Sequence, residues 1–156
     1  MFKKHPDGMR MEPTPERVLA LCRMVAKQPM EKKELQRILS LNWKADADHG
    51  LVNYAYNVAL DELGLIQLND NMVSYVADPS IIADTTAFRR YVSANIFQRD
   101  DTTFVKFTKW VIAQNERIFA MGSWQGMANT CKDENPEIRS IAEKPGLGWR
   151  FWVTFL

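Results

Sequence analysis

The spacing of apolar positions in the first half of the chain changes from a helical to an extended period. Three segments repeat apolar residues at the spacing of an amphipathic helix: residues 14–28, 31–41 and 48–63. After Gly64 the repeat shortens, and two β-prone runs, residues 65–68 and 72–76, flank a polar turn. The pattern predicts three helices followed by a β-hairpin.

Local signals set the ends and faces of these elements. Thr14 is the expected N-cap of the first helix, with Pro15 as its first residue, and Pro29 closes it. The second helix is expected to bury Leu35, Ile38 and Leu39. The third helix ends at Gly64, which suits a left-handed C-terminal position. It turns Val52, Tyr56, Leu60 and Leu63 inward and presents a polar stripe of Asn53, Asn57 and Asp61, flanked by Tyr54.

The second half is predicted to be helical throughout. Asp84 or Thr85 caps a helix with Phe88, Tyr91, Val92 and Phe97 directed inward. Residues 100–121 read as one helix that is apolar over more than half its circumference, so we expect it to pack on more than one side. Short helices follow from Trp124 and Glu137, with a break at Asn135 and Pro136, a turn at 145–148 and a final apolar helix.

Helix, helix, helix and hairpin within residues 13–80 resemble the winged-helix form of the helix-turn-helix superfamily, and the run "LDELGLI" resembles its helix-to-wing junction. The segment "HPDGMRMEPTPERVLALCR" also resembles the N-terminal part of bacterial genome-defence proteins such as the Dpd DNA-modification group, which implies a setting in phage defence. The resulting expectation is a mainly α fold. A flexible lead-in (1–12) precedes a winged helix (13–80) and an all-α helical bundle (81–156).

Composition narrows the class of protein. The chain has 156 residues, a formal net charge of +1 and a pI near 7.8, which does not indicate a strongly basic nucleic-acid protein. Cys22 and Cys131 lie far apart and predict reduced thiols, so we expect a cytoplasmic protein without a membrane span. The chain stops at Leu156 inside an aromatic segment. We therefore expect either the N-terminal part of a longer protein or an end that docks on a partner.

The residues that usually signal catalysis are not arranged in a known motif. There is no G-x-S-x-G, Walker loop or H-E-x-x-H, and "GLG" at Gly146 lacks the rest of a dinucleotide-binding fingerprint. His5 falls in the lead-in, and His49 fits a capping role better than a catalytic one. The "DADHG" run lacks the length of a calcium loop. We expect a non-catalytic protein without cofactor or metal.

A DNA-binding role follows from the geometry of a helix-turn-helix, whose third helix enters the major groove. Asparagine pairs with adenine through both atoms of its amide, and tyrosine reaches phosphate, so Asn53, Tyr54 and Asn57 are candidate base and backbone contacts. The candidate phosphate contacts are basic residues of the second helix and the connector after it: Lys32, Lys33, Arg37 and Lys44. Asn69 and Asn71 are expected at the tip of the wing.

The net negative charge of the first half of the chain argues against DNA binding, so other interpretations remain open. Residues 14–79 carry seven Lys and Arg against nine Asp and Glu, whereas phosphate neutralisation supplies most non-specific affinity. Asn53 and Asn57 also fit a solvated helix face, and Lys32 and Lys33 fit an exposed face balanced by acidic neighbours.

The alternative is an adaptor that binds protein or dimerises without DNA, with the helical half as a homodimer contact or docking surface. Its aromatic residues suit a core or an interface: Trp110, Trp124, Trp149, Phe151, Trp152 and Phe155. A catalytic part beyond Leu156 is a further option.

Overall fold

The computed structural model describes residues 12–40, 50–138 and 143–156. These residues form eight α-helices and a small three-stranded antiparallel sheet, so the fold is mainly helical. The described chain separates into two compact units: the N-terminal unit, residues 12–93, and the C-terminal unit, residues 94–155. The sequence places the division at residue 80. Residues 81–93 group with the N-terminal unit because the chain after the hairpin returns to α1.

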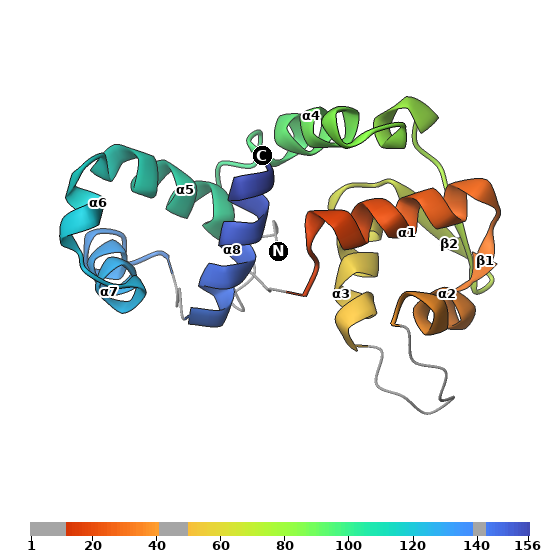
Figure 1. Ribbon diagram of the computed structural model, residues 1–156, viewed down its shortest axis with the longest axis horizontal. Coiled ribbons are helices and arrows are strands. Elements are labelled where there is room, and N and C mark those ends of the chain that lie inside the picture. The colour runs from red at the N-terminus through yellow and green to blue at the C-terminus, as the bar shows by residue number, and fades with distance from the viewer. Residues whose placement is uncertain (1–11, 41–49, 139–142) are drawn as a thin grey trace. The chain divides into compact units, whose positions relative to one another are not determined.

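The first helix, α1 (Pro15–Lys27), packs on α3 and on the sheet (Figure 1). Its N-terminus is closed as predicted, since Thr14 Oγ1 accepts a hydrogen bond from the Arg17 amide at 3.4 Å. The apolar stripe of α1, formed by Val18, Leu21, Cys22 and Val25, is buried. The helical period therefore identified the inward face of α1 correctly.

The sheet contains the predicted hairpin and one additional strand. Strands β2 (Ile66–Asn69) and β3 (Met72–Tyr75) pair antiparallel, and the turn residues Asp70 and Asn71 have φ of 48° and 69°. Two successive positive φ angles suit a two-residue hairpin, and Asp and Asn tolerate them. Strand β1 (Met30–Glu31) pairs with β3 on its other edge, giving the order β1-β3-β2. Strand β1 has only two residues, which is too short for an alternating pattern, so the sequence did not predict it.

Helix α2 (Lys32–Leu39) is attached to the unit through one fully buried side chain. Leu35 has no exposed surface, whereas Ile38 and Leu39, predicted to be buried as well, are half-buried. Helix α2 therefore buries less of its apolar face than its sequence suggests. At its N-terminus, the Lys32 amide donates to the Asn71 carbonyl at 2.9 Å, which joins α2 to the hairpin turn.

The third helix is not a single α-helix up to Leu63. Helix α3 (Gly50–Asn57) continues as a π-helical turn, η1 (Val58–Glu62), in which the Leu63 amide donates to the Val58 carbonyl at 2.9 Å. The wider turn changes which side chains face inward, because Val58 and Ala59 are buried and Leu60 is only half-buried. Gly64 ends the segment with φ of 63°, as predicted.

The 3₁₀ turn η2 (Pro79–Ile82) and α4 (Thr85–Ile96) follow the hairpin. Asp84 caps α4 by accepting from the Ala87 amide at 2.8 Å. Arg23 of α1 donates to the Ile82 carbonyl at 2.8 Å, and Tyr91 donates its hydroxyl hydrogen to the Leu63 carbonyl at 2.7 Å. These bonds connect the segment after the hairpin to both α1 and the end of η1.

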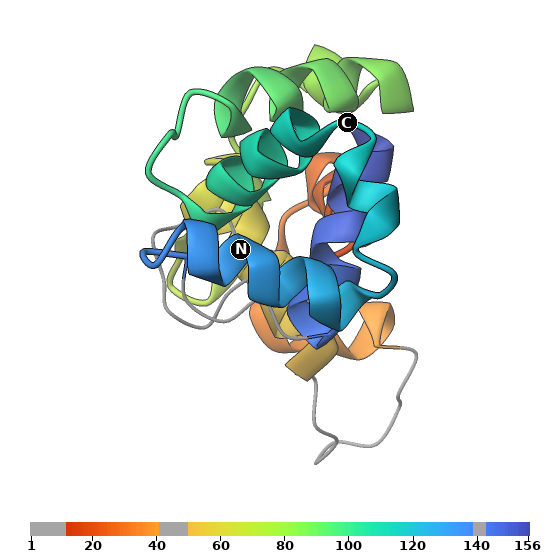
Figure 2. The ribbon, with the colours of Figure 1, turned by 90° about the vertical axis from the view of Figure 1, so that its left-hand side faces the viewer.

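The C-terminal unit contains α5 (Thr103–Gln114), α6 (Arg117–Ala120), α7 (Trp124–Glu134) and α8 (Glu143–Phe155). Short α6 turns the chain from α5 into α7 (Figures 1 and 2). The single helix predicted for residues 100–121 is wrong, because Asn115 has φ of 49° and ends α5.

Three large apolar residues of the predicted helices are exposed. Ile112 is 72% exposed and Phe119 is 85% exposed. The buried side chains of α5, among them Phe104, Val105, Phe107 and Trp110, nevertheless lie around more than half of the helix, as its apolar pattern predicted. Phe97, predicted to face inward in the preceding helix, lies just after the end of α4 and is 39% exposed. Phe88 and Val92 are buried as expected.

Two predictions for the C-terminal segment are wrong. The turn expected at residues 145–148 lies inside α8, and Glu137 lies in a turn rather than at a helix start. The Gly146 backbone approaches the indole of Trp124 so closely that a Cβ atom would overlap the ring. The same indole meets Phe107 and Trp149 at centroid distances of 5.7 and 6.1 Å. Glycine is therefore required at this position for close packing, not for a turn.

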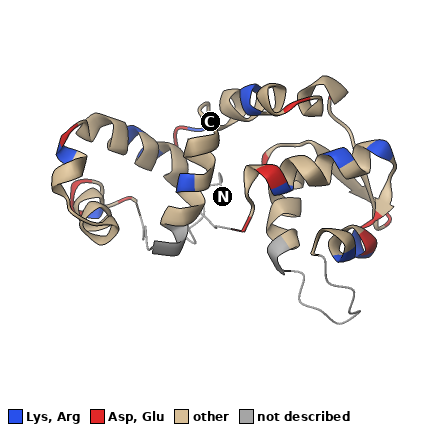
Figure 3. Cartoon of the chain, viewed as in Figure 1, with Lys and Arg blue, Asp and Glu red and all other residues tan. Residues whose placement is uncertain are grey.

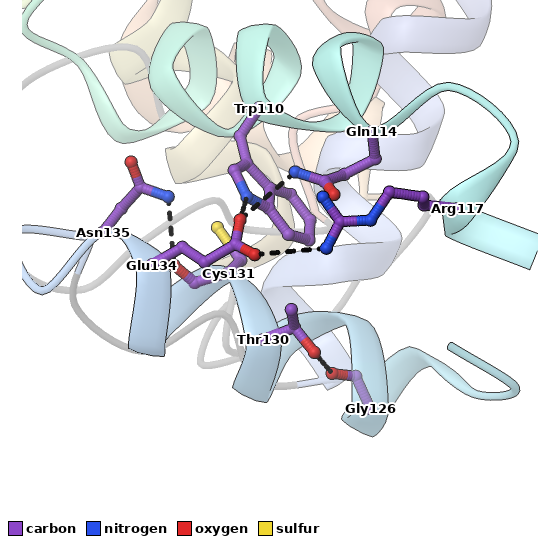
Figure 4. A network of polar contacts seen from close by, with 8 residues as sticks. All are labelled: Trp110, Gln114, Arg117, Gly126, Thr130, Cys131, Glu134 and Asn135. Atoms are coloured by element: carbon purple, nitrogen blue, oxygen red, sulfur yellow. Dashed lines mark hydrogen bonds and ion pairs between the residues drawn. The ribbon is translucent and has the colours of Figure 1, made fainter. Parts of the chain in front are cut away.

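A polar network joins α5, α6 and α7 (Figure 4). Glu134 Oε2 accepts from Trp110 Nε1 at 2.7 Å and from Gln114 Nε2 at 3.3 Å, and Oε1 lies 3.7 Å from Arg117 Nη2. Trp110 and Gln114 are buried whereas Glu134 is 40% exposed, so removing this carboxylate takes away the side-chain acceptor that both donors share.

We expect Glu134→Ala to destabilise the C-terminal unit by about 1–3 kcal/mol, the usual cost of leaving buried donors unpaired. Glu134→Gln retains a carbonyl acceptor and should cost less. Denaturant unfolding followed by tryptophan fluorescence measures both, and Asp133→Ala, an exposed neighbour, is the control. Equal losses from Glu134→Ala and Asp133→Ala would refute this role for the network.

Within the described segments, no helix combines the length and apolar character needed to cross a membrane.

Candidate functional site

A polar groove lies in the N-terminal unit where β1, α2, α3 and the hairpin turn meet. Its volume is about 540 Å³. The lining residues come from all four elements: Glu31, Lys32, Lys33, Gln36, Asn53, Asp70 and Asn71. We call this the α2–α3 groove.

The three predicted basic residues of α2 differ in their availability. Lys33 is exposed at the groove. Lys32 is half-buried, with its Nζ 4.6 Å from the centroid of the Tyr56 ring, a cation–π distance. Arg37 donates to both carboxylate oxygens of Glu34, at 2.8 and 2.5 Å, and this contact lowers the pKa of Glu34. Lys33 is therefore the α2 cation best placed to meet an anion.

The predicted polar stripe of α3 is only partly exposed. Asn57 is exposed, whereas Asn53 and Tyr54 are half-buried. Asn53 Oδ1 accepts a hydrogen bond from Gln36 Nε2 of α2, so the amide is held by a neighbouring helix. Tyr56 beside them is buried as expected, and burial is the main cause of the raised pKa of its phenol.

Acidic residues share the groove with the lysines. Glu31 lies beside Lys32, and Asp70 lies at the hairpin tip across from α2. Helix α2 carries Lys32, Lys33 and Arg37 with one acidic residue, Glu34, while the sequence of α3 contains no charged residue (Figure 3). An approaching polyanion would meet both attraction and repulsion at this surface.

The structure brings together four of the residues selected from the sequence: Lys32, Lys33, Asn53 and Asn71. Arg37, Tyr54, Asn57 and Asn69 do not line the groove, and Lys44 lies outside the described residues. Sequence reasoning missed Gln36. Its position four residues after Lys32 placed it on the same helical face, which is the signal that would have found it.

A second groove in the same unit is mainly apolar. Its volume is about 310 Å³, and Ala20, Ile38, Leu39, Val52 and Ala55 form its walls, with Glu16 and Arg17 contributing polar atoms. The incomplete burial of Ile38 and Leu39 follows from their position on this groove.

The two cysteines do not provide a nucleophile. Burial raises the pKa of Cys22 to about 12, and burial together with the nearby Glu134 and Glu137 raises the pKa of Cys131 to about 12 as well. Both thiols are fully buried, so almost none of either is thiolate at neutral pH.

Comparison with protein-family models, curated proteins and solved structures gave no match.

Proposed function

We propose that the N-terminal unit is a winged helix and that the chain is a non-catalytic, DNA-associated binding module. The order of elements supports the fold: α1, β1, α2, α3, then the β2–β3 hairpin, in a sheet ordered β1-β3-β2. The observation that carries the function is the convergence of Lys32, Lys33, Asn53 and Asn71 on one groove. These residues belong to the helix pair and wing that meet a duplex in this class of fold.

The groove offers one residue for a phosphate contact and another for a base contact. Lys33 supplies a mobile positive charge for a phosphate, and Asn53 supplies an amide for a base edge. Asn71 lies at the wing, and its carbonyl accepts the backbone hydrogen bond from the Lys32 amide that joins the wing to α2. Glu31 and Asp70 limit the attraction, so a single module should bind weakly and gain affinity from dimerisation or from a larger assembly.

We expect the full chain to bind random-sequence duplex DNA with an affinity that falls steeply with salt. Lys33→Ala should weaken binding to all duplexes alike and reduce the salt slope by about one. Lys27→Ala removes another exposed lysine, which lies on α1 outside the groove, and should change binding little. Fluorescence anisotropy at several salt concentrations measures these effects.

A second candidate is a protein-binding adaptor that does not contact DNA. The exposed Ile112 and Phe119 of α5 and α6 favour it, because aromatic and aliphatic residues are common at the centres of protein interfaces. The DNA titration separates the two candidates. Absence of salt-dependent binding, or equal loss from Lys27→Ala and Lys33→Ala, would favour the adaptor over the DNA-associated module.

A further inference from the structure

The chain bends between α5 and α6 at a strained residue. Asn115 has φ of 49° and ψ of −130°, a conformation that glycine adopts readily and that residues with a side chain rarely adopt. The sequence around it suits a helix, because positions 103–121 contain neither proline nor glycine. The local backbone preference therefore opposes the bend, and contacts with more distant residues must hold it.

These contacts join α5 to the two helices that follow the bend. Trp110 Nε1 of α5 donates to Glu134 of α7 at 2.7 Å (Figure 4). Trp149 Nε1 of α8 donates to Thr108 Oγ1 of α5 at 2.9 Å. Such contacts require that the two surfaces meet, not that both surfaces belong to the same copy of the chain. A second copy can therefore supply α7 and α8 to this α5.

Two exposed apolar side chains flank the bend. Ile112 is 72% exposed and Phe119 is 85% exposed, more than any other large apolar side chain of the described residues. Ile112 lies three positions before Asn115, and Phe119 lies three positions after Glu116. If the bend straightened, the two side chains would be seven positions apart on one face of a continuous helix. Two such helices crossing antiparallel at the bend would bring Ile112 of each copy against Phe119 of the other.

We propose that the chain forms a domain-swapped dimer, in which α5 and α6 straighten into one helix and α7 and α8 pack on α5 of a second copy. The exchange keeps the contacts between α5 and the α7–α8 pair, because each is made again between copies. It also removes the strain at Asn115 and buries Ile112 and Phe119, which the monomer leaves exposed. Short connections under strain favour this kind of exchange. The dimer involves the C-terminal unit and does not depend on DNA binding.

Two substitutions of Asn115 should shift the equilibrium in opposite directions. Asn115→Ala favours the straight helix, because alanine is a strong helix former and tolerates positive φ poorly. Asn115→Gly favours the bend for the opposite reasons. Each dimer straightens two bends, so the dissociation constants of the two dimers should differ by at least about a hundredfold. Sedimentation equilibrium after incubation at high concentration measures both. Equal dissociation constants, or a dimer in neither variant, would overturn the inference.

The exposed phenylalanine of α6 tests the new contact at the bend. Phe119→Ser, made in the Asn115→Ala chain, should weaken the dimer by about tenfold or more, because each dimer loses two buried rings. The matched control is Phe151→Ser in the same chain, which replaces a 45% exposed phenylalanine of α8. It should leave the dissociation constant almost unchanged. The same effect from both substitutions would contradict an interface at the bend.

A covalent cross-link distinguishes an exchanged dimer from two copies that only associate. Lys106 Nζ of α5 lies 3.6 Å from Glu137 Oε1, which follows α7. Cysteines at these two positions, introduced into the Asn115→Ala chain, are therefore within reach of a short thiol-specific cross-linker. In an exchanged dimer the link joins two chains and gives a covalent dimer on a denaturing gel. Lys106→Cys alone controls for the native Cys22 and Cys131. Links within single chains only, in the dimer fraction, would refute the exchange.

Discussion

Leu35→Ala should destabilise the N-terminal unit by about 3–5 kcal/mol and abolish binding through the α2–α3 groove. Leu35 is the fully buried side chain of α2, and replacing a buried leucine by alanine leaves a cavity at about this cost. Helix α2 also carries Lys32, Lys33 and Gln36, so loosening its one hydrophobic anchor displaces three of the groove residues together. Amide hydrogen exchange resolved by peptide should show faster exchange across residues 32–39.

Leu68→Ala is the matched control for this experiment. It makes the same chemical change in the same unit, but Leu68 is 38% exposed on β2, so the expected loss is much smaller. A similar loss of stability from both variants would show that Leu35 does not anchor α2. If Leu35→Ala still bound DNA at full affinity, the α2–α3 groove would not be the DNA-binding site.

The elements that the sequence predicted best are those with local signals at both ends. Thr14 and Gly64 bound their helices as expected, and Asp70 and Asn71 adopt the positive φ angles that the turn requires. These features depend on a residue's own backbone preference and on neighbours within a few positions. They are therefore visible in a single sequence.

The errors occur where distant packing decides the local structure. The π turn at Val58–Glu62 changes the inward face of α3, and no residue type in it demands a π turn. Asn115 interrupts a segment whose apolar pattern alone reads as continuous helix. Gly146 suggested a turn, but its role depends on Trp124, more than twenty positions earlier in the chain.

The candidate site was predicted by residue type but not by arrangement. Lys33 and Asn57 are exposed as the helical periods indicated. The pairing of Asn53 with Gln36, and of Arg37 with Glu34, depends on how α2 and α3 meet or on the rotamers chosen in α2. A helical wheel shows which face a residue occupies. It does not show which of its atoms are already bonded.

Gly146→Ala tests the close packing of α8 on α7, and two effects of opposite sign compete. Alanine is favoured over glycine inside a helix by about 1 kcal/mol, so at an unobstructed position the substitution would stabilise α8. At Gly146 the new Cβ atom would overlap the Trp124 indole, which is itself held by Phe107 and Trp149. Forcing a methyl group into a packed core usually costs about 1–3 kcal/mol, and more where rings must move.

We expect the packing effect to win, because both neighbours of the indole are aromatic and neither can yield without disturbing α5 or α8. Gly146→Ala should then lower the unfolding free energy of the C-terminal unit by about 2–3 kcal/mol. Tryptophan fluorescence reports mainly on this unit, since four of the chain's five tryptophans, Trp110, Trp124, Trp149 and Trp152, belong to it. Thr154→Ala, at an exposed position of the same helix, should change stability little. A gain in stability from Gly146→Ala would mean that helix propensity governs this position and that α8 does not pack against Trp124 at Gly146.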